Sequence, residues 1–278
     1  MLQHNLDRMY MSWGDFTRGQ LDADLVIMGA SRAWVQYNPA ILDSILHIST
    51  YNMGIDGSPL NRQICKYNIF NYYQQKQPDY IIINIDYFAL EWRDGYQREQ
   101  FFPYIMKSYP RNEIRKVEPF SKLEMYVPLY RYVKQQGIAY YFIDNKTEVL
   151  FKGYAGQDME WDPTAFNKID SFHFSSDERT IKMFEKFLED RKVEGIKILF
   201  CYAPVYEGFT KKIDNQKEMN DTYQKIADRY EIPILDYTYD AMCSDTTLFY
   251  NAMHLNKKGA EMFSEKLAYD LESLGIIK

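Results

Sequence analysis

The chain has 278 residues, a mass of 33.2 kDa and a formal net charge of −6 at pH 7. Hydrophobic residues make up 46% and charged residues 26%, which is ordinary for a globular protein. The acidic balance argues against nonspecific nucleic-acid binding. No apolar run reaches the roughly 18 residues that span a bilayer, and the polar amino-terminal stretch lacks the apolar core of a signal peptide. We therefore expect no nucleic-acid partner, no membrane span and no export address in this sequence.

The first third of the chain alternates between short apolar runs and helical patterns. Residues 24–29 read as a buried strand, and an Asn-Pro pair then starts a helix over 39–46. An alternating stretch over 47–54 predicts a second strand, and 59–75 has helical spacing. The β-branched run over 78–86 is typical of a central parallel strand.

The middle of the chain, 87–175, is too long for a simple crossover between strands. It contains a helical pattern near 121–136 and a loop-rich stretch over 152–166. We expect this region to be an insertion after the third strand, packed over the sheet edge or acting as a lid.

The last third returns to alternation. It contains helical patterns over 177–193, 215–230 and 257–273, with buried strands between them over 196–204 and 231–237. Strands that alternate with helices indicate a mostly parallel sheet covered by helices on both faces. The sequence thus predicts a three-layer α/β/α sandwich, a single domain over 1–278.

Ligands of open parallel sheets bind beyond the carboxyl ends of the strands. Ser31 follows the first strand in a glycine-containing turn, where a base could activate its hydroxyl. His254 lies in a loop that leads into the last helix, at the same expected edge. The other histidines, His4, His47 and His173, lie elsewhere. The plainer interpretation, a capping serine and a structural histidine, competes with this pairing.

Three blocks, in this order along the chain, resemble the SGNH hydrolases of the GDSL esterase group. They are GASR at 29–32, NMGIDG at 52–57 and NAMHLNKKGAEMFSEKLA at 251–268. The resemblance implies a flavodoxin-like α/β/α fold of the SGNH type. It also implies Ser31 as nucleophile, His254 as base, and the N–H groups of Ser31 and Gly54 as oxyanion donors.

Two positions depart from the family pattern. Asn251 stands where the family has the acid three residues before the histidine. Its oxygen can orient the imidazole but supplies no charge to the imidazolium. The Asn of the third block falls near Phe88, and Asn84 is the weaker candidate donor in its place. The alternative for Asn84 and Asp86 is strand-end capping or a salt bridge.

Four residues near the expected cleft are candidates for substrate binding: Arg32, Asp86, Tyr87 and Trp34. A guanidinium beside the nucleophile could hold an anionic or hydroxylated substrate, or it could lock Asp86, which we favour slightly. The aromatic residues could stack on sugar rings or form a packed rim.

Metal and cofactor sites are not expected. No two histidines stand at ligand spacing, and there is no glycine-rich dinucleotide or phosphate loop. Cys65, Cys201 and Cys243 fit neither a zinc site nor a disulfide framework, and Cys65 and Cys201 lie in apolar patterns typical of buried thiols.

The resemblance and the 17% aromatic content together suggest an esterase or O-acyltransferase that acts on an acylated, for example acetylated, carbohydrate. Hydrolase and transferase both stay open, because they differ only in the final acceptor. The alternatives are a weakly active or inactive relative that binds polysaccharide or a protein, and an α/β domain whose function lies on the insertion. Relatives often act in the cell envelope, although this sequence carries no signal that places it there.

Overall fold

The computed structural model describes residue 21 and residues 23–96, 98–102, 104–127, 130–133 and 151–277. The chain divides into two compact units. One contains residues 22–63, 76–92 and 151–278, and the other contains the rest of the chain. Within the described part, residues 151–175 of the predicted insertion therefore lie in the same unit as the sheet. The single domain with an inserted lid stays a prediction.

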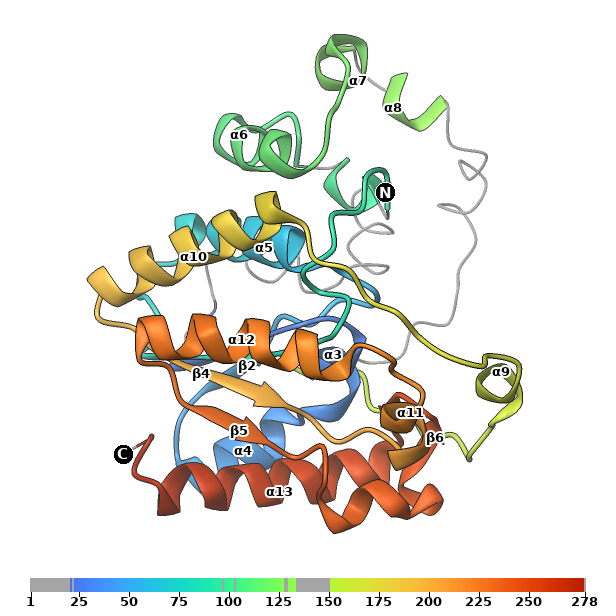
Figure 1. Cartoon of the computed structure of the whole chain (residues 1–278). Helices are drawn as coiled ribbons and strands as arrows, with labels where there is room; N and C mark the ends of the chain where they lie inside the picture. Colours follow the sequence, from blue (N-terminus) through green and yellow to red (C-terminus); the bar gives the residue numbers. More distant parts are fainter. Residues whose placement is uncertain are drawn as a thin grey trace. The chain divides into compact units, whose positions relative to one another are not determined.

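A five-stranded parallel sheet forms the centre of the larger unit (Figure 1). Its order is β2-β1-β3-β4-β5, the flavodoxin-like order 2-1-3-4-5. The strands are β1 (Leu25–Met28), β2 (Thr50–Asn52), β3 (Tyr80–Asn84), β4 (Lys197–Tyr202) and β5 (Ile234–Asp236). Their inner positions are fully apolar because helices cover both faces of a parallel sheet. In register, Ile27 pairs with Ile82, and Ile82 with Leu199.

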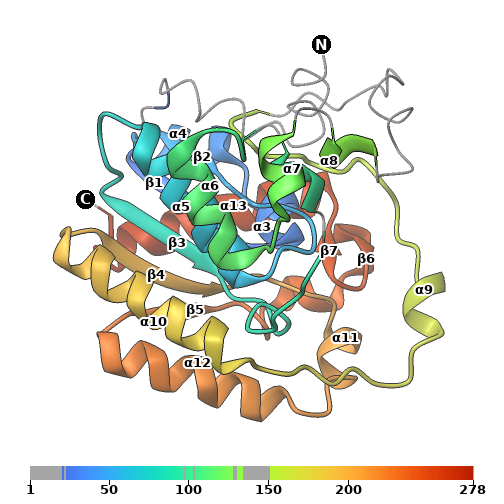
Figure 2. The same ribbon diagram turned by 90° about the horizontal axis from the view of Figure 1, so that it is seen from above.

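Helices pack on both faces, which confirms the predicted three-layer α/β/α class (Figures 1 and 2). On one face, α13 (Lys257–Ser273) packs against α4 (Pro39–Leu46). On the other, α10 (Glu178–Val193) packs against β4 and α12 (Gln216–Tyr230). The predicted ranges of these two helices agree with α4 and α13, and both helices begin at an asparagine cap. Asn38 Oδ1 accepts from Ala40 N at 3.0 Å, and Asn256 Oδ1 accepts from Gly259 N at 3.0 Å.

Tyrosine contributes to the core between the sheet and α13. The Phe263 ring meets Tyr37 and Tyr237 edge-on, with centroids 5.1 Å and 5.2 Å apart. The buried hydroxyl of Tyr237 donates to Asp270 Oδ2 at 2.7 Å. Part of the high tyrosine content therefore lies in the core, where a buried tyrosine hydroxyl needs a hydrogen-bond partner.

The other described elements are shorter. In the larger unit they are α3 (Ser31–Gln36), α9 (Thr164–Asn167), α11 (Glu207–Lys211), two 3-10 turns (Ala241–Ser244 and Thr246–Leu248) and the hairpin β6 (Phe249–Asn251) and β7 (His254–Leu255). Helix α5 (Leu60–Tyr73) begins in this unit and continues into the other. The other unit also contains a 3-10 turn (Arg98–Phe101), α6 (Ser108–Val117), α7 (Lys122–Tyr126) and α8 (Tyr130–Val133).

The prediction of one helix near 121–136 is wrong. The capping box of Ser121 and Glu124 starts α7, which ends at Tyr126. Val127 is extended, with φ −93° and ψ 116°, as expected for a residue before proline, here Pro128. A separate helix, α8, follows from Tyr130, and residues 134–136 lie outside the described part of the chain.

Candidate active site

Ser31 is the first residue of α3, directly after β1. The turn between them needs a glycine, because a Cβ at Gly29 would lie 2.5 Å from the Ala33 Cβ and 2.9 Å from the Asn84 Cβ. Ser31 is therefore held at the carboxyl end of the sheet with 7% of its surface exposed. Its backbone N–H belongs to the first helical turn, where amide groups have no partner within the helix.

His254 is positioned by the β6–β7 hairpin, in which Asn251 and His254 pair across the two strands. Asn251 Oδ1 accepts from Met253 N at 2.9 Å and lies 2.9 Å from His254 Nδ1. Because Met253 N–H is a donor, the Asn251 atom between them must be the oxygen, and Nδ1 of His254 must then carry the proton. This leaves Nε2 as the acceptor of the imidazole.

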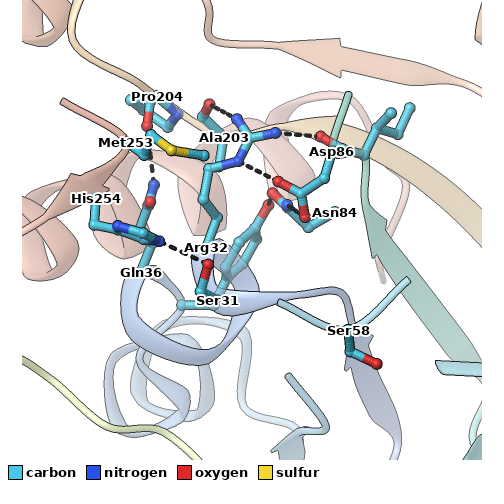
Figure 3. A network of polar contacts seen from close by, with 12 residues as sticks. Ser31, Arg32, Gln36, Ser58, Asn84, Asp86, Ala203, Pro204, Met253 and His254 are labelled. Atoms are coloured by element: carbon cyan, nitrogen blue, oxygen red, sulfur yellow. Dashed lines mark hydrogen bonds and ion pairs between the residues drawn. The ribbon is translucent and has the colours of Figure 1, made fainter. Parts of the chain in front are cut away.

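The two candidate catalytic side chains meet. His254 Nε2 lies 2.7 Å from Ser31 Oγ, although the residues are 223 positions apart in the sequence (Figure 3). With Nδ1 protonated, the Ser31 hydroxyl donates to Nε2, which is the arrangement of a serine nucleophile and its general base. Asn251 occupies the third, orienting position.

Burial and, to a smaller extent, the positive charge of Arg32 lower the pKa of His254 from its ordinary 6.5 to about 3. The amide of Asn251 carries no charge that would oppose this. The imidazole is therefore neutral over the ordinary pH range, which is the form that accepts a proton. An imidazolium at His254 would have no carboxylate beside it at position 251.

Arg32 directly follows Ser31, and its buried side chain bonds to groups at the ends of the strands (Figure 3). Its Nε donates to Asp86 Oδ1, and the two side chains form a buried ion pair. Its Nη1 donates to Ala203 O at 3.2 Å and its Nη2 to Ile85 O at 2.6 Å. Arg32 and Asp86 thus make the structural lock that the sequence leaves open beside substrate binding.

Asn84 belongs to the same network. Its Oδ1 accepts from the Tyr37 hydroxyl at 2.8 Å, and its Nδ2 donates to Asp86 Oδ2 at 3.1 Å. The side chain is 1% exposed. The amide is therefore used to orient Asp86, and its predicted part in the oxyanion hole gains no support from this geometry.

Gly54 is placed beside α3, but its N–H donates to Asn52 Oδ1 at 2.9 Å. Asn52 in turn donates to Ala33 O at 2.6 Å. A Cβ at Gly54 would lie 2.3 Å from Trp34 N and 2.6 Å from Trp34 Cα, so the glycine allows two backbone segments to touch. As an oxyanion donor, Gly54 would first have to release Asn52, and the role stays a prediction.

The two aromatic candidates differ in exposure. Tyr87 is 3% exposed and its ring stacks on Phe174 with centroids 5.8 Å apart. Its hydroxyl accepts from Gln216 Nε2 at 3.3 Å. Tyr87 is therefore part of a packed rim. Trp34 is half-buried, and its carbonyl accepts from Ala155 N at 3.0 Å.

Two other histidines, His47 and His173, lie away from this pair. His47 ends α4 in the left-handed conformation, with φ 54°. His173 is exposed and its Nδ1 lies 2.8 Å from Asp214 Oδ1. His4 is outside the described residues. Within the described ranges, no group of three or more His, Cys, Asp or Glu side chains is arranged to hold a metal ion.

Sequence reasoning missed two features of the site. The first is Tyr250, whose ring stacks on His254 with centroids 5.4 Å apart and 8° between the planes. Its place next to Asn251 is the one sequence signal that could have indicated it. The second is the stretch 151–162, which lacks periodicity but bonds to α3, α13 and the hairpin. All three cysteines are buried, as predicted for Cys65 and Cys201. No helix in the part of the chain that the structure describes is long and apolar enough to cross a membrane.

No protein-family model and no curated protein matches the sequence. Solved structures do match. A protein assigned to the G-D-S-L lipolytic family from Desulfitobacterium hafniense is 13% identical, with 89% of this chain and 99% of that chain covered and a TM-score of 0.46. An acetylxylan esterase from Geobacillus stearothermophilus is 13% identical, with coverage of 91% and 94% and a TM-score of 0.45. A family two carbohydrate esterase from Clostridium thermocellum, solved with cellohexaose, is 9% identical, with coverage of 92% and 65% and a TM-score of 0.45.

The three sequence blocks occupy the places in the sheet that the resemblance implies. GASR follows β1, NMGIDG follows β2, and the block with His254 leads into α13. The strand order is the flavodoxin-like one. By topology and by the places of these blocks, the chain has an SGNH hydrolase-like fold.

Proposed function

We propose that this protein is a serine esterase or O-acyltransferase. The observation that carries the proposal is the 2.7 Å contact between Ser31 Oγ and His254 Nε2, with His254 Nδ1 held by Asn251. A separation too large for one bridging water would have excluded catalysis by this pair. The contact instead allows direct proton transfer.

The proposed reaction has two steps. Ser31 Oγ attacks the ester carbonyl while its proton passes to His254 Nε2, and the protonated imidazole then returns that proton to the leaving alcohol as the ester bond breaks. The resulting acyl-serine is attacked by water, or by the hydroxyl of an acceptor, with His254 again as base. Attack by water gives a carboxylic acid, and attack by an acceptor hydroxyl gives a new ester; in both cases the proton returns from His254 to Ser31 Oγ.

The N–H of Ser31 is the proposed donor to the oxyanion, because it lies in the open first turn of α3. Gly54 N–H is a second donor only if substrate displaces Asn52 Oδ1. Arg32 and Asp86 act as positioning residues, since their polar atoms are directed at each other and at the backbone.

The proposed substrate is an acylated, for example acetylated, carbohydrate. Half-buried aromatic side chains beside the hairpin support it: Tyr250, Trp161 and Tyr206. Such rings combine apolar area with polar surroundings, which suits a sugar ring that presents both C–H faces and hydroxyl groups.

A fluorophosphonate probe with peptide mapping tests the nucleophile. We expect labelling at Ser31 in the wild type and none in the Ser31→Ala and His254→Ala variants, with p-nitrophenyl acetate turnover lost in parallel. Each variant is first checked for a cooperative thermal transition. Folded wild-type protein that takes no label would contradict the proposal.

A second candidate function is carbohydrate or protein binding without efficient catalysis. It is favoured by the neutral Asn251 and by the engagement of the two predicted donors, Gly54 N–H and Asn84 Nδ2. Losing one oxyanion donor typically lowers a rate by about 10²–10³-fold. This candidate predicts no labelling together with measurable binding in a glycan screen. Given labelling, adding a sugar acceptor separates transfer from hydrolysis through the product formed.

A further inference from the structure

Residues 151–162, which we call the strap, are fixed to every element that carries the Ser31–His254 pair. Ala155 N donates to the carbonyl of Trp34 in α3 at 3.0 Å. Lys257 N, at the start of α13, donates to Gln157 O at 2.8 Å. Asp162 N donates to Tyr250 O in the hairpin at 2.9 Å. Backbone hydrogen bonds therefore fix the course of the strap relative to α3, α13 and the hairpin.

Three aromatic side chains gather where the strap leaves the hairpin, and we call them the aromatic cluster: Trp161, Phe166 and Tyr206. The ring centroid of Tyr206 lies 4.9 Å from that of Trp161 and 6.0 Å from that of Phe166, with interplanar angles of 62° and 88°. Tyr206 N donates to Ala252 O at 3.1 Å, two residues before His254. The cluster is therefore joined to the loop that presents the base.

The cluster is only half buried. All three rings are partly exposed, unlike the buried rings of the core. Lys212 fixes Phe166 by donating to its carbonyl at 3.2 Å and by lying 4.1 Å from the ring centroid. Edge-to-face packing of this kind holds aromatic rings rigid. Their side chains therefore lose little additional freedom when a ligand stacks on them.

The strap beside the cluster carries carboxylates, which favour a ligand with hydroxyl groups over an anion. Asp158, Glu160 and Asp162 are exposed on the strap next to Trp161. Carboxylates accept hydrogen bonds from hydroxyl groups and repel anions. The negative faces of aromatic rings attract the positively polarised C–H groups of a pyranose ring by the same electrostatics that orients aromatic pairs.

We propose that the aromatic cluster is the platform for the uncharged sugar ring that carries the ester. This inference rests on the proposed function and adds to it the residues that set substrate class. The ring would stack on Trp161 while its acyl group reaches Ser31. The strap carboxylates would receive its free hydroxyl groups.

The test compares two substrates of different size. The specificity constant is measured on p-nitrophenyl acetate and on an acetylated xylo-oligosaccharide for the wild type, Trp161→Ala and Trp161→Phe. We expect Trp161→Ala to lose roughly tenfold more on the oligosaccharide than on p-nitrophenyl acetate, mainly through KM, and Trp161→Phe to recover most of that loss. Tyr269→Ala is the matched control, because Tyr269 is an exposed ring (53%) on α13 away from the cluster. Equal losses on the two substrates would overturn the platform.

A binding measurement separates this inference from the proposed function. Calorimetric titration of Ser31→Ala with the acetylated oligosaccharide is repeated in the Ser31→Ala/Trp161→Ala double variant, with both proteins first shown to unfold cooperatively. A roughly tenfold weaker Kd in the double variant supports the platform even if the wild type turns over neither substrate, in which case only the esterase proposal fails. Turnover of p-nitrophenyl acetate together with an unchanged Kd supports the esterase and overturns the platform.

Discussion

The side-chain amide of Asn251 determines which nitrogen of the His254 imidazole carries the proton. Because Met253 N–H and His254 Nδ1 both face Asn251 Oδ1, the tautomer of His254 is set without a carboxylate. In a serine protease triad, the change from Asp to Asn lowers turnover about 10⁴-fold, through the wrong tautomer. Here the tautomer is correct, so what Asn251 withholds is charge. The residue that departs from the family pattern thus keeps the geometry of an acid and loses its electrostatics.

Asn251→Asp should raise the rate. A carboxylate beside Nδ1 favours the imidazolium, so the pKa of His254 should move up from about 3. We expect about a 10- to 100-fold gain in kcat on p-nitrophenyl acetate, below the full triad effect because orientation is already in place. The wild-type rate should show no acid limb near the ordinary pKa of histidine, and the variant should acquire one above that of the wild type.

Asn167→Asp is the control for this change, because it adds the same charge at an exposed position at the end of α9. It should change neither the rate nor its pH profile. A rate for Asn251→Asp equal to that of the wild type would show that charge at this position does not limit catalysis.

At the scale of elements, the site depends on backbone segments that touch without side chains between them. The exit of β2 lies against α3 at Gly54, and the exit of β1 lies against β3 at Gly29. Both close approaches are possible only because neither glycine carries a Cβ. A substitution at either glycine is therefore expected to displace α3, the helix that begins at Ser31.

Gly54→Ala should displace α3. The new Cβ would meet Trp34 N and Cα at 2.3 Å and 2.6 Å, and backbone atoms cannot turn aside as a side chain can. We expect a loss of roughly 1–3 kcal/mol in the free energy of unfolding, together with slower fluorophosphonate labelling at Ser31. Both are measured on the same preparation, by denaturant titration and by labelling rate.

Gly195→Ala is the matched control for Gly54→Ala. Gly195 precedes β4, has φ +77° and has open space around its would-be Cβ. It should lower stability by about 1–2 kcal/mol through backbone strain alone and leave the labelling rate unchanged. If both variants label equally fast, contact between Gly54 and α3 does not position Ser31.

For the whole molecule, burying a neutral histidine makes stability depend on pH. The folded-state pKa of His254 lies near 3 and the unfolded value near 6.5, so the unfolded chain binds the extra proton between these limits. The free energy of unfolding should therefore fall as pH drops from about 6.5 toward 3, by at most ~1.4 kcal/mol per pH unit for this group. His254→Gln should lose less stability than the wild type between about pH 7 and pH 5 in denaturant titrations. Parallel losses in both proteins would assign the acid sensitivity to other groups.

The sequence predicts the apolar strands of this fold better than the polar contacts of the candidate site. The strands at 25–28 and 80–84 are recognisable because burial on both faces demands continuous apolar runs. The hydrogen bonds that engage Gly54 N–H and Asn84 Nδ2 are not recognisable in the sequence. Their partners, Asn52 and Asp86, are brought into place only when the strand ends and turns have formed. The Ser31–His254 pair was predictable since both residues stand at strand ends that parallel topology brings to one edge. The hairpin that positions His254 was not predictable, because its two strands have only three and two residues.

The 223-residue separation of Ser31 and His254 also has a consequence in time. During synthesis β1 and the first turn of α3 are made well before His254 and the helix that follows it, α13. Contacts between distant parts of a chain form late, because loop closure costs entropy before they can contribute. The serine hydroxyl therefore stays chemically inert on a nascent or half-folded chain. Under the proposed function, reactivity at Ser31 would therefore report completed folding, and a chain that stalls before α13 would have no acyl-transfer activity.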